Sequence, residues 1–361
     1  MKKRILFFVG TRPEGIKMAP VIKTFRDSSS FITKVCNSGQ HKELLDQTLN
    51  FFDIKPDFDL AIMSPNQSLE QLTARLLTAI SELLNQEKPD LIFVHGDTST
   101  CFVAALSAFY KKIPIAHIEA GLRTNNKFSP FPEEINRVMV SKLADFHFSP
   151  TELAKKNLLK EGVDPKKVFV TGNTVIDALF ETIKLIKDDG KQEKLILITG
   201  HRRENFGKGF ENIFSAIKKL ANKYDDFSFV YPVHPNPNVK KIAEKYFTNL
   251  PNVKLIAPLD YPEFVTLMKN SYLIITDSGG IQEEAPSLGK PVIVTRDTTE
   301  RPEAVTSGTV LLVGDSVDKI ERAVSKLIED KEYYSSFKNI QNPYGDGNAS
   351  SRILKEMEQA L

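Results

Sequence analysis

Carboxylates follow several short apolar runs of the sequence, close to the point where each run ends. Asp97 comes after the run Leu91–His95, Glu119 comes after Ile113–Ile118, and Glu133 follows a proline-rich turn. Carboxylates that face one site serve as general acid and base when their surroundings separate their pKa values. The structural alternatives are a helix N-cap for Asp97 and first-turn helix stabilisation for Glu133. Glu119 has no comparably simple structural role.

A second segment, Thr276–Glu284, predicts an anion site. An apolar run leads into Ser278, Gly279 and Gly280 and then into a helix. Glycines let the backbone approach an anion, and a helix N-terminus offers N–H groups at its positive end. The pattern suits a diphosphate, with Glu284 accepting hydrogen bonds from ribose hydroxyls. The alternative is a tight turn in which the two glutamates of this segment stabilise the first helical turn.

Basic side chains accompany these segments. Arg12 and Lys17 follow the first apolar run, and Arg301 comes after the glycine-rich segment. They offset phosphate charge without a metal; the alternative for the first two is a pair of solvated surface cations. Neither GxxxxGK[ST] nor GxGxxG occurs, and the six histidines show no HxxxH or HExxH spacing, so we expect no metal and no cofactor. His201, beside two arginines, suits a phosphate or a leaving group.

Strand-like and helix-like segments alternate from end to end. The expected strands are Ile5–Val9, Leu91–His95, Ile113–Ile118, Val168–Thr171, Leu195–Thr199, Phe227–Val233, Val253–Ile256, Tyr272–Thr276, Val292–Thr295 and Val310–Val313. The expected helices include Leu69–Leu84, Phe210–Leu220, Val317–Ile328 and Ala349–Leu361. Because many runs are apolar throughout, they predict parallel strands covered on both faces by helices. The fold class is therefore α/β, with doubly wound parallel sheets that bind ligands beyond the carboxyl ends of their strands.

Two domains are expected. A strand and a helix near Thr171 are followed by the polar run 187–194, after which a fresh strand begins. We assign residues 1–171 to an N-terminal Rossmann-like domain and residues 172–345 to a second one. Residues 346–361 form a last helix that returns to the first domain.

Composition excludes several classes of protein. The 361 residues carry 48 Lys and Arg against 46 Asp and Glu, a formal charge of +2, which argues against binding nucleic acid. Two cysteines, Cys36 and Cys101, support neither a disulfide framework nor a four-cysteine zinc site and are expected to be buried. The apolar run near residue 1 is too short for a signal peptide, and no run approaches the roughly 18 residues of a membrane span. We expect a cytoplasmic protein without a membrane segment.

Seven motifs together resemble one family. They are GTRPEGIKMAP, HGDT, HIEAGLRT, SPFPEEINR, TGHRREN, YPVHPNP and DSGGIQEEAPSLGKPVIVTRDTTERPE. In order and spacing they resemble the non-hydrolysing UDP-N-acetylglucosamine 2-epimerases. The resemblance implies a GT-B-like fold with the active site in the cleft between two Rossmann-like domains. It also implies a homodimer that interconverts UDP-GlcNAc and UDP-ManNAc for bacterial surface polysaccharide.

The resemblance also implies a mechanism and residue roles. UDP is eliminated from C1 of the sugar while C2 loses its proton, and UDP then adds back to bound 2-acetamidoglucal. The implied acid and base groups are Asp97, Glu119 and Glu133, without an assignment to either face of the sugar. The implied diphosphate, nucleoside and sugar contacts are Arg12, Lys17, Arg137, His201, Phe264, Ser278, Gly279, Gly280, Glu284 and Arg301. Arg137 would orient Glu133, four residues earlier on the same helix face, or touch the sugar.

One region departs from the pattern of the family. Bacterial members bind a second UDP-GlcNAc as an activator, and Gln40 and His41 match the start of that site. Glu43 and Asn66 stand where glutamine and arginine are expected. A carboxylate facing a diphosphate weakens binding, so we expect weak or altered activation.

Other readings remain open on the sequence alone. An epimerase of a diacetamido or 6-deoxy UDP-sugar is one, and a hydrolysing epimerase that releases ManNAc and UDP is another. A GT-B glycosyltransferase and a nucleotide-sugar-binding regulator without catalysis are less well matched. All three carboxylates are present, which favours an enzyme over a regulator.

Overall fold

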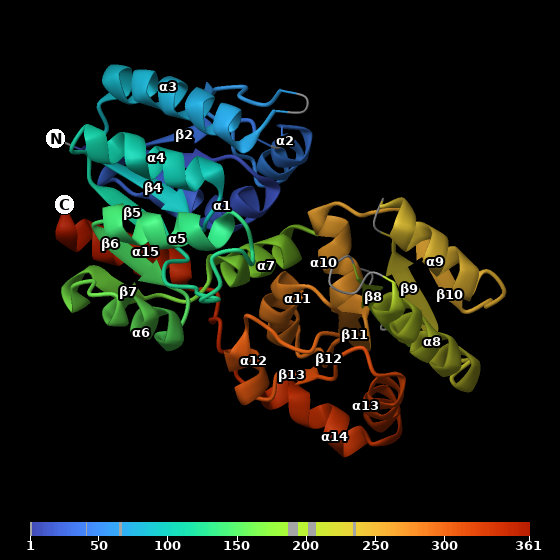
Figure 1. Cartoon of the computed structure of the whole chain (residues 1–361). Helices are drawn as coiled ribbons and strands as arrows, with labels where there is room; N and C mark the ends of the chain where they lie inside the picture. The colour runs from blue at the N-terminus through green and yellow to red at the C-terminus, as the bar shows by residue number, and fades with distance from the viewer. Residues whose placement is uncertain (1, 41, 65–66, 187–193, 201–206, 234–235) are drawn as a thin grey trace. The chain divides into compact units, whose positions relative to one another are not determined.

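The computed structural model describes residues 2–40, 42–64, 67–186, 194–200, 207–233 and 236–361. The chain divides into two compact units, unit 1 (Met1–Phe180 with Tyr344–Leu361) and unit 2 (Glu181–Pro343). Helix α7 (Thr174–Leu185) contains the boundary. Each unit is built on its own sheet (Figure 1).

Unit 1 contains, within its described residues, a seven-stranded sheet in the order β3-β2-β1-β4-β5-β6-β7. All of its strand pairs are parallel. The strands are β1 (Lys3–Val9), β2 (Phe31–Asn37), β3 (Phe58–Asp59), β4 (Leu91–His95), β5 (Ile115–Ile118), β6 (Phe146–Ser149) and β7 (Val168–Val170). The order reverses between β1 and β4, which makes the carboxyl ends of these two strands the switch point where such sheets bind ligands.

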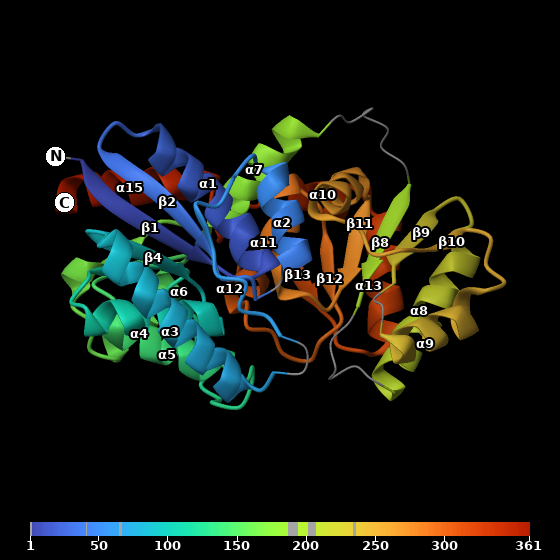
Figure 2. The same cartoon turned by 90° about the horizontal axis from the view of Figure 1, so that it is seen from above.

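Helices cover both faces of this sheet, so its central strands are buried on both sides. Helices α3 (Leu69–Glu87), α4 (Ser99–Tyr110) and α5 (Glu133–Leu143) lie side by side on one face (Figures 1 and 2). The other face carries α1 (Arg12–Asp27) and α15 (Ala349–Ala360). The remaining helices of the unit are α2 (Lys42–Phe51) and α6 (Glu152–Lys160).

Helix α15 joins the end of the chain to its beginning. Asp177, on α7, accepts hydrogen bonds from the backbone N–H groups of Ala349 (3.2 Å) and Ser350 (2.8 Å). Further along, α15 buries Ile353 and Met357 completely. These contacts make α15 part of the core of unit 1.

Unit 2 has, in the part that the structure describes, a six-stranded parallel sheet in the order β10-β9-β8-β11-β12-β13. Its strands are β8 (Leu195–Thr199), β9 (Ser228–Pro232), β10 (Val253–Ile256), β11 (Leu273–Thr276), β12 (Val292–Val294) and β13 (Val310–Leu312). Its helices are α8 (Lys208–Lys223), α9 (Pro237–Phe247), α10 (Tyr261–Asn270), α11 (Gly279–Glu284), α12 (Pro302–Thr306), α13 (Val317–Glu329) and α14 (Lys331–Ser336). The switch point of this sheet lies between β8 and β11.

The predicted fold class is confirmed, with three strands added that the sequence analysis missed: β2, β3 and β6. Cys36 and Cys101 are free thiols and both are buried, as expected. Among the described residues, no helix is both long and apolar enough to cross a membrane.

Candidate functional site

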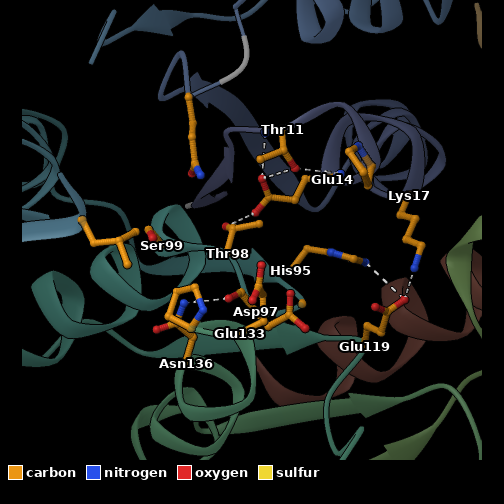
Figure 3. A pocket seen from close by; sticks show the side chains of 15 residues that line it. Thr11, Glu14, Lys17, His95, Asp97, Thr98, Ser99, Glu119, Glu133 and Asn136 are labelled. Atoms are coloured by element: carbon orange, nitrogen blue, oxygen red, sulfur yellow. Dashed lines mark hydrogen bonds and ion pairs between the residues drawn. The ribbon is translucent and has the colours of Figure 1, made fainter. Parts of the chain in front are cut away.

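A pocket of about 400 Å³ opens at the switch point of unit 1, and Figure 3 shows the side chains around it. The turns after β1, β4 and β5 and the start of α5 contribute to its wall. The lining residues are Thr11, Pro13, Glu14, Lys17, Gln40, Leu69, His95, Gly96, Asp97, Thr98, Ser99, Glu119, Pro132, Glu133 and Asn136. All three carboxylates predicted as acid and base groups therefore lie around one pocket.

The turn after β1 is held by a capping box. Thr11 is the N-cap of α1, and Glu14, at the third helical position, accepts hydrogen bonds from the backbone N–H groups of Gly10 (3.0 Å) and Thr11 (2.8 Å). Pro13 occupies the first turn, as expected from the sequence. Lys17 follows on the same helix and points toward Glu119 (Figure 3).

Asp97 lies in a turn that its neighbours fix. Gly96 has φ +65°, a left-handed conformation that favours glycine, and its carbonyl oxygen accepts a hydrogen bond from His117 Nε2 (2.8 Å). Asn136 Nδ2 donates to the Asp97 carbonyl oxygen (2.8 Å), and Arg137 forms an ion pair with the Asp97 carboxylate. The N-cap of α4 is Thr98, so the alternative N-cap role for Asp97 is wrong.

Burial raises the pKa of Asp97 above its usual range, Arg137 opposes that rise, and Glu119 and Glu133 add to it. Neighbouring carboxylates that share one pocket disfavour one another's charged forms.

Glu119 has a strained backbone and a carboxylate with several polar neighbours. Its φ of +63° is uncommon for a residue with a side chain, and such strain persists where surrounding contacts hold it. Its carboxylate pairs with Lys17 and accepts a hydrogen bond from Asn173 Nδ2 (3.0 Å). His95 Nε2 lies 3.8 Å from the same carboxylate.

His95 is neutral at physiological pH. Burial lowers the pKa of His95 to about 4; Glu119 opposes that shift, and Lys17 adds to it. A neutral imidazole contributes a donor and an acceptor to the pocket without adding charge.

Glu133 and Glu134 both lie in the first turn of α5, as the structural alternative expected. Glu134 accepts hydrogen bonds from the backbone N–H groups of Thr124 (3.0 Å) and Asn125 (2.9 Å), and it lies 3.5 Å from Arg137. The Oε2 atom of Glu133 is buried and makes no hydrogen bond within the described part of the chain. The orientation of Glu133 by Arg137, and contact of Arg137 with a sugar, remain predictions.

The other residues predicted in unit 1 lie at the edge of this pocket or beyond it. Arg12 is half-buried at the start of α1. Gln40 lines the pocket and accepts a hydrogen bond from Thr100 Oγ1 (3.0 Å), whereas Glu43 is exposed in the first turn of α2. His41 and Asn66 lie outside the described residues.

The switch point of unit 2 carries the glycine-rich turn. Ser278 is the N-cap of α11 without a side-chain cap bond, and Gly279 and Gly280 form its first turn. A Cβ on Gly279 would lie 3.4 Å from the Arg301 guanidinium carbon, which places this cation beside the turn. His201, which comes two residues after the end of β8 in the sequence, lies outside the described residues.

Carboxylates organise the surroundings of this turn. Glu283 accepts a hydrogen bond from Arg301 Nε (2.7 Å), and Glu284 accepts one from the Tyr261 hydroxyl (2.7 Å). Both glutamates end α11, so the alternative in which they stabilise its first turn is wrong. Phe264 lies half-buried on α10, three residues after Tyr261.

Sequence reasoning missed several residues of the first pocket. Glu14, Thr98 and Asn136 line it, and Asn173 bonds to Glu119. The spacing Thr11-x-x-Glu14 is a capping-box signal that was available in the sequence. The described residues contain no group of three or more His, Cys, Asp or Glu side chains arranged to hold a metal ion.

Comparisons with known proteins agree on one family. The sequence model described as UDP-N-acetylglucosamine 2-epimerase matches residues 23–358. The UDP-N-acetylglucosamine 2-epimerase of Neisseria meningitidis serogroup A is 53% identical over 98% of this chain and 99% of its own, and that of Escherichia coli K12 is 49% identical over 98% of each.

Solved structures of similar proteins extend this agreement. The crystal structure of the UDP-GlcNAc 2-epimerase from Neisseria meningitidis bound to UDP-GlcNAc has a TM-score of 0.90 and 51% identity, covering 99% of this chain and 100% of that one. The enzyme of Methanocaldococcus jannaschii, in complex with UDP-GlcNAc and UDP, has a TM-score of 0.82 and 35% identity, covering 99% of each chain. The fold of the present chain is accordingly GT-B-like.

Proposed function

Because the chain belongs to the UDP-N-acetylglucosamine 2-epimerase family, we propose that it interconverts UDP-GlcNAc and UDP-ManNAc without net hydrolysis. The observation that carries this proposal is the gathering of Asp97, Glu119 and Glu133 around one pocket at the switch point of unit 1. Inversion at C2 of a sugar requires a proton to leave one face and return to the other. Two or more carboxylates around that carbon supply the base and the acid.

The proton on C2 has no adjacent carbonyl group to acidify it. We propose that UDP leaves C1 as C2 loses its proton in an anti elimination, so that 2-acetamidoglucal forms and stays bound. Protonation of C2 from the other face and return of UDP to C1 then complete the epimerisation. Negative charge develops on the departing diphosphate, and fixed cations and N–H groups stabilise that charge.

The surroundings of the three carboxylates suit different roles. Glu119 is paired with Lys17 and accepts a hydrogen bond from Asn173. Asp97 has a raised pKa, and Glu133 has a buried oxygen with no hydrogen-bond partner among the described residues. Asp97 and Glu133 are therefore the proposed proton carriers, with Glu119 holding Lys17 in place.

For the nucleotide we propose residues of unit 2, together with Arg12 and Lys17. Ser278, Gly279 and Gly280 would bind the diphosphate through hydroxyl and backbone N–H groups. The remaining proposed contacts are Glu284 with ribose, Phe264 with uracil, and Arg301 and His201 with the diphosphate or leaving group.

The proposed roles in the cell follow from the family resemblance. UDP-ManNAc would supply ManNAc-derived sugars of bacterial surface polysaccharide, made in the cytoplasm by a homodimer. A second UDP-GlcNAc would act only as a weak or altered activator, because Glu43 and Asn66 depart from the family pattern.

The test is proton NMR of the protein with UDP-GlcNAc in deuterated water without added metal. The proposal predicts UDP-ManNAc and deuterium at C2 of both epimers. Free ManNAc with UDP would instead assign a hydrolysing epimerase, and no exchange would redirect the search to diacetamido and 6-deoxy UDP-sugars. Scrambling of an ¹⁸O label between bridging and non-bridging positions of the β-phosphate would report cleavage of the bond to C1.

Variants connect the reaction to the pocket. Asp97→Asn and Glu133→Gln are each expected to slow C2 exchange by about 10²-fold or more, since each removes a proton carrier. Glu87→Gln is the matched control, because Glu87 is a carboxylate of the same unit that pairs with Lys34 (2.6 Å) away from the pocket. Exchange that survives at the wild-type rate in both site variants would remove these residues from the mechanism.

A further inference from the structure

The buried carboxylate of Glu14 joins the two turns that flank the switch point of unit 1. On the side of β1, its Oε2 atom accepts hydrogen bonds from Gly10 N (3.0 Å), Thr11 N (2.8 Å) and Thr11 Oγ1 (3.0 Å). On the side of β4, its Oε1 atom accepts a hydrogen bond from Thr98 Oγ1 (2.7 Å). Figure 3 shows Glu14 between Thr11 and Thr98, on the wall of the pocket. The proposed reaction leaves this residue without a role.

The hydroxyl of Thr98 has one hydrogen, and its two hydrogen bonds determine where that hydrogen points. Thr98 Oγ1 accepts a hydrogen bond from Cys101 N (3.0 Å), which caps α4. Its own hydrogen goes to Glu14. An ionised carboxylate can only accept hydrogen bonds. As long as Glu14 is charged, Thr98 must therefore be the donor and Glu14 the acceptor.

Asp97 is joined to Thr98 by a peptide bond and is restrained on its other sides. Arg137 pairs with its carboxylate, and Asn136 Nδ2 donates to its carbonyl oxygen (2.8 Å). The contact between Glu14 and Thr98 is the restraint that comes from α1, the helix that also carries Lys17. One carboxylate thus connects the turn bearing the proposed proton carrier with the helix bearing the proposed cation.

We propose that Glu14 is a positioning residue of the epimerisation. Its ionised carboxylate, acting through Thr98, fixes the position of Asp97 relative to Lys17. The proposal rests on the proposed function. Glu14 acts through its neighbours and exchanges no proton with the sugar. A displacement of a reacting group by about 1 Å lowers rates by about 10²-fold, so a restraint of this kind matters for turnover more than for binding.

The charge of Glu14 is essential to the proposal, because an amide of the same shape has a different pattern of donors. In Glu14→Gln the amide oxygen takes the place of Oε2 and still accepts the three hydrogen bonds from Gly10 and Thr11. The NH₂ group then faces Thr98 Oγ1, whose hydrogen must turn elsewhere. Protonation of Glu14 on Oε1 has the same effect, so the variant imitates the protonated wild type.

Glu14 titrates in the range in which this difference is measurable. Desolvation raises the pKa of Glu14 to about 7, against the lowering effect of its four hydrogen bonds. The charged and titratable groups that share its pocket come from α1, β4, the turns after β4 and β5, and α5; they are Lys17, His95, Asp97, Glu119 and Glu133. Cys101, on α4, interacts electrostatically with Glu14. The wild type therefore loses the ionised form of Glu14 as the pH falls through about 7.

The experiment measures kcat, KM for UDP-GlcNAc and the pH profile of kcat in wild type and Glu14→Gln. We expect kcat to fall about tenfold to a hundredfold at pH 8 and KM to change by less than about threefold. The part of the acid limb of kcat that lies near pH 7 should be absent from the variant, which keeps the part that Asp97 contributes. Asp177→Asn is the matched control, since Asp177 is another buried carboxylate of unit 1 that accepts two backbone N–H groups, and it lies outside the pocket. It is expected to retain wild-type kcat and the wild-type pH profile.

Thr98 provides a second test. Thr98→Ser keeps the hydroxyl and is expected to retain kcat, whereas Thr98→Val removes it and is expected to reproduce the kcat loss of Glu14→Gln. Wild-type kcat in Glu14→Gln, or equal losses in Glu14→Gln and Asp177→Asn with unchanged pH profiles, would overturn the positioning role alone. A wild-type protein that exchanges no C2 proton would overturn the proposed function as well.

Discussion

Arg137, on α5, forms an ion pair with Asp97, which lies forty residues earlier on the turn after β4. Its second carboxylate neighbour is Glu134, at 3.5 Å. Helical spacing places Arg137 on the same face of α5 as Glu133, but it does not indicate the contact with Asp97. The packing of α5 against α4 instead brings the guanidinium to the switch point, where it compensates a buried carboxylate.

Arg137→Met tests this pairing. Without the guanidinium, Asp97 is buried beside two other carboxylates, so its pKa rises further and less of it is ionised at neutral pH. We expect kcat/KM for UDP-GlcNAc to fall by about 10- to 100-fold and its acid limb to move to higher pH. Arg26→Met, which removes the exposed pair with Asp57 (3.4 Å), is the control. An acid limb at the wild-type position would show that Asp97 does not control it.

His95 reports the balance of charge between Lys17 and Glu119. Lys17 contributes to the lowering of the pKa of His95, and Glu119 opposes it. Lys17→Met should therefore raise the pKa of His95 from about 4, and Glu119→Gln should lower it further. NMR titration of the His95 ring nitrogens, assigned with a His95→Gln variant, measures both shifts. Shifts of the same sign in the two variants would contradict the charge arrangement described here.

Glu14 gives the stability of unit 1 a specific pH dependence. Between the ordinary carboxyl pKa of 4.5 and the folded value of about 7, the folded protein binds the proton that the unfolded chain releases, so stability falls as the pH rises. Relative to Glu14→Gln, the wild type should gain about 2 to 3 kcal/mol in free energy of unfolding between pH 8 and pH 5. Urea unfolding of both proteins at several pH values measures this difference. A difference that is constant across the range would refute the raised pKa.

A substitution at Gly280 is expected to change ligand binding without destabilising the fold. A Cβ at this position would have Ser278 Oγ as its nearest neighbour, at 3.9 Å, and the residue lies in the first turn of α11. Gly280→Ala should therefore leave thermal stability unchanged or raise the free energy of unfolding by up to about 1 kcal/mol. If a diphosphate approaches this backbone, the methyl group should weaken UDP binding by about tenfold or more, a loss of about 1.4 kcal/mol. Uridine, which lacks phosphate, is the control ligand and should bind both proteins equally in calorimetry.

Glu43 allows the expected weak or altered substrate activation to be tested. It is exposed in the first turn of α2, close in sequence to Gln40, which lines the pocket. We expect the wild type to show nearly hyperbolic dependence of rate on UDP-GlcNAc, and Glu43→Gln to show steeper dependence, because a repulsive charge is removed. Glu87→Gln again serves as the control. Strongly sigmoidal kinetics of the wild type would disprove the expectation.

Much of the architecture was predictable because the central strands are apolar throughout and end in polar, glycine-containing turns. Strand β2 was not predicted because Thr33 and Lys34 interrupt its apolar pattern. Strand β6 was not predicted because it has only four residues, one of which is His147. Short or interrupted runs of this kind carry too little periodicity to be recognised. The polar turns that follow the predicted strands could still be recognised as candidate ligand-binding segments.

The contacts between residues of the pocket were harder to predict from the sequence than the identities of those residues. Lys17 and Glu119 are 102 residues apart, and Glu14 and Thr98 are 84 apart. Their contacts exist because β1 lies beside β4, and β4 beside β5, in the sheet. Sequence patterns name the side chains that follow each strand, but strand order and helix packing decide which of them meet.

The position of α15 in unit 1 has a consequence for synthesis on the ribosome. The strands of this unit are translated first, but Ile353 and Met357, which α15 buries in its core, are translated only after all of unit 2. Until then Asp177 has no helix to cap, and the surface of α1 that α15 covers faces water. Unit 2 is contiguous in sequence and can complete its folding while the nascent unit 1 still lacks its last helix.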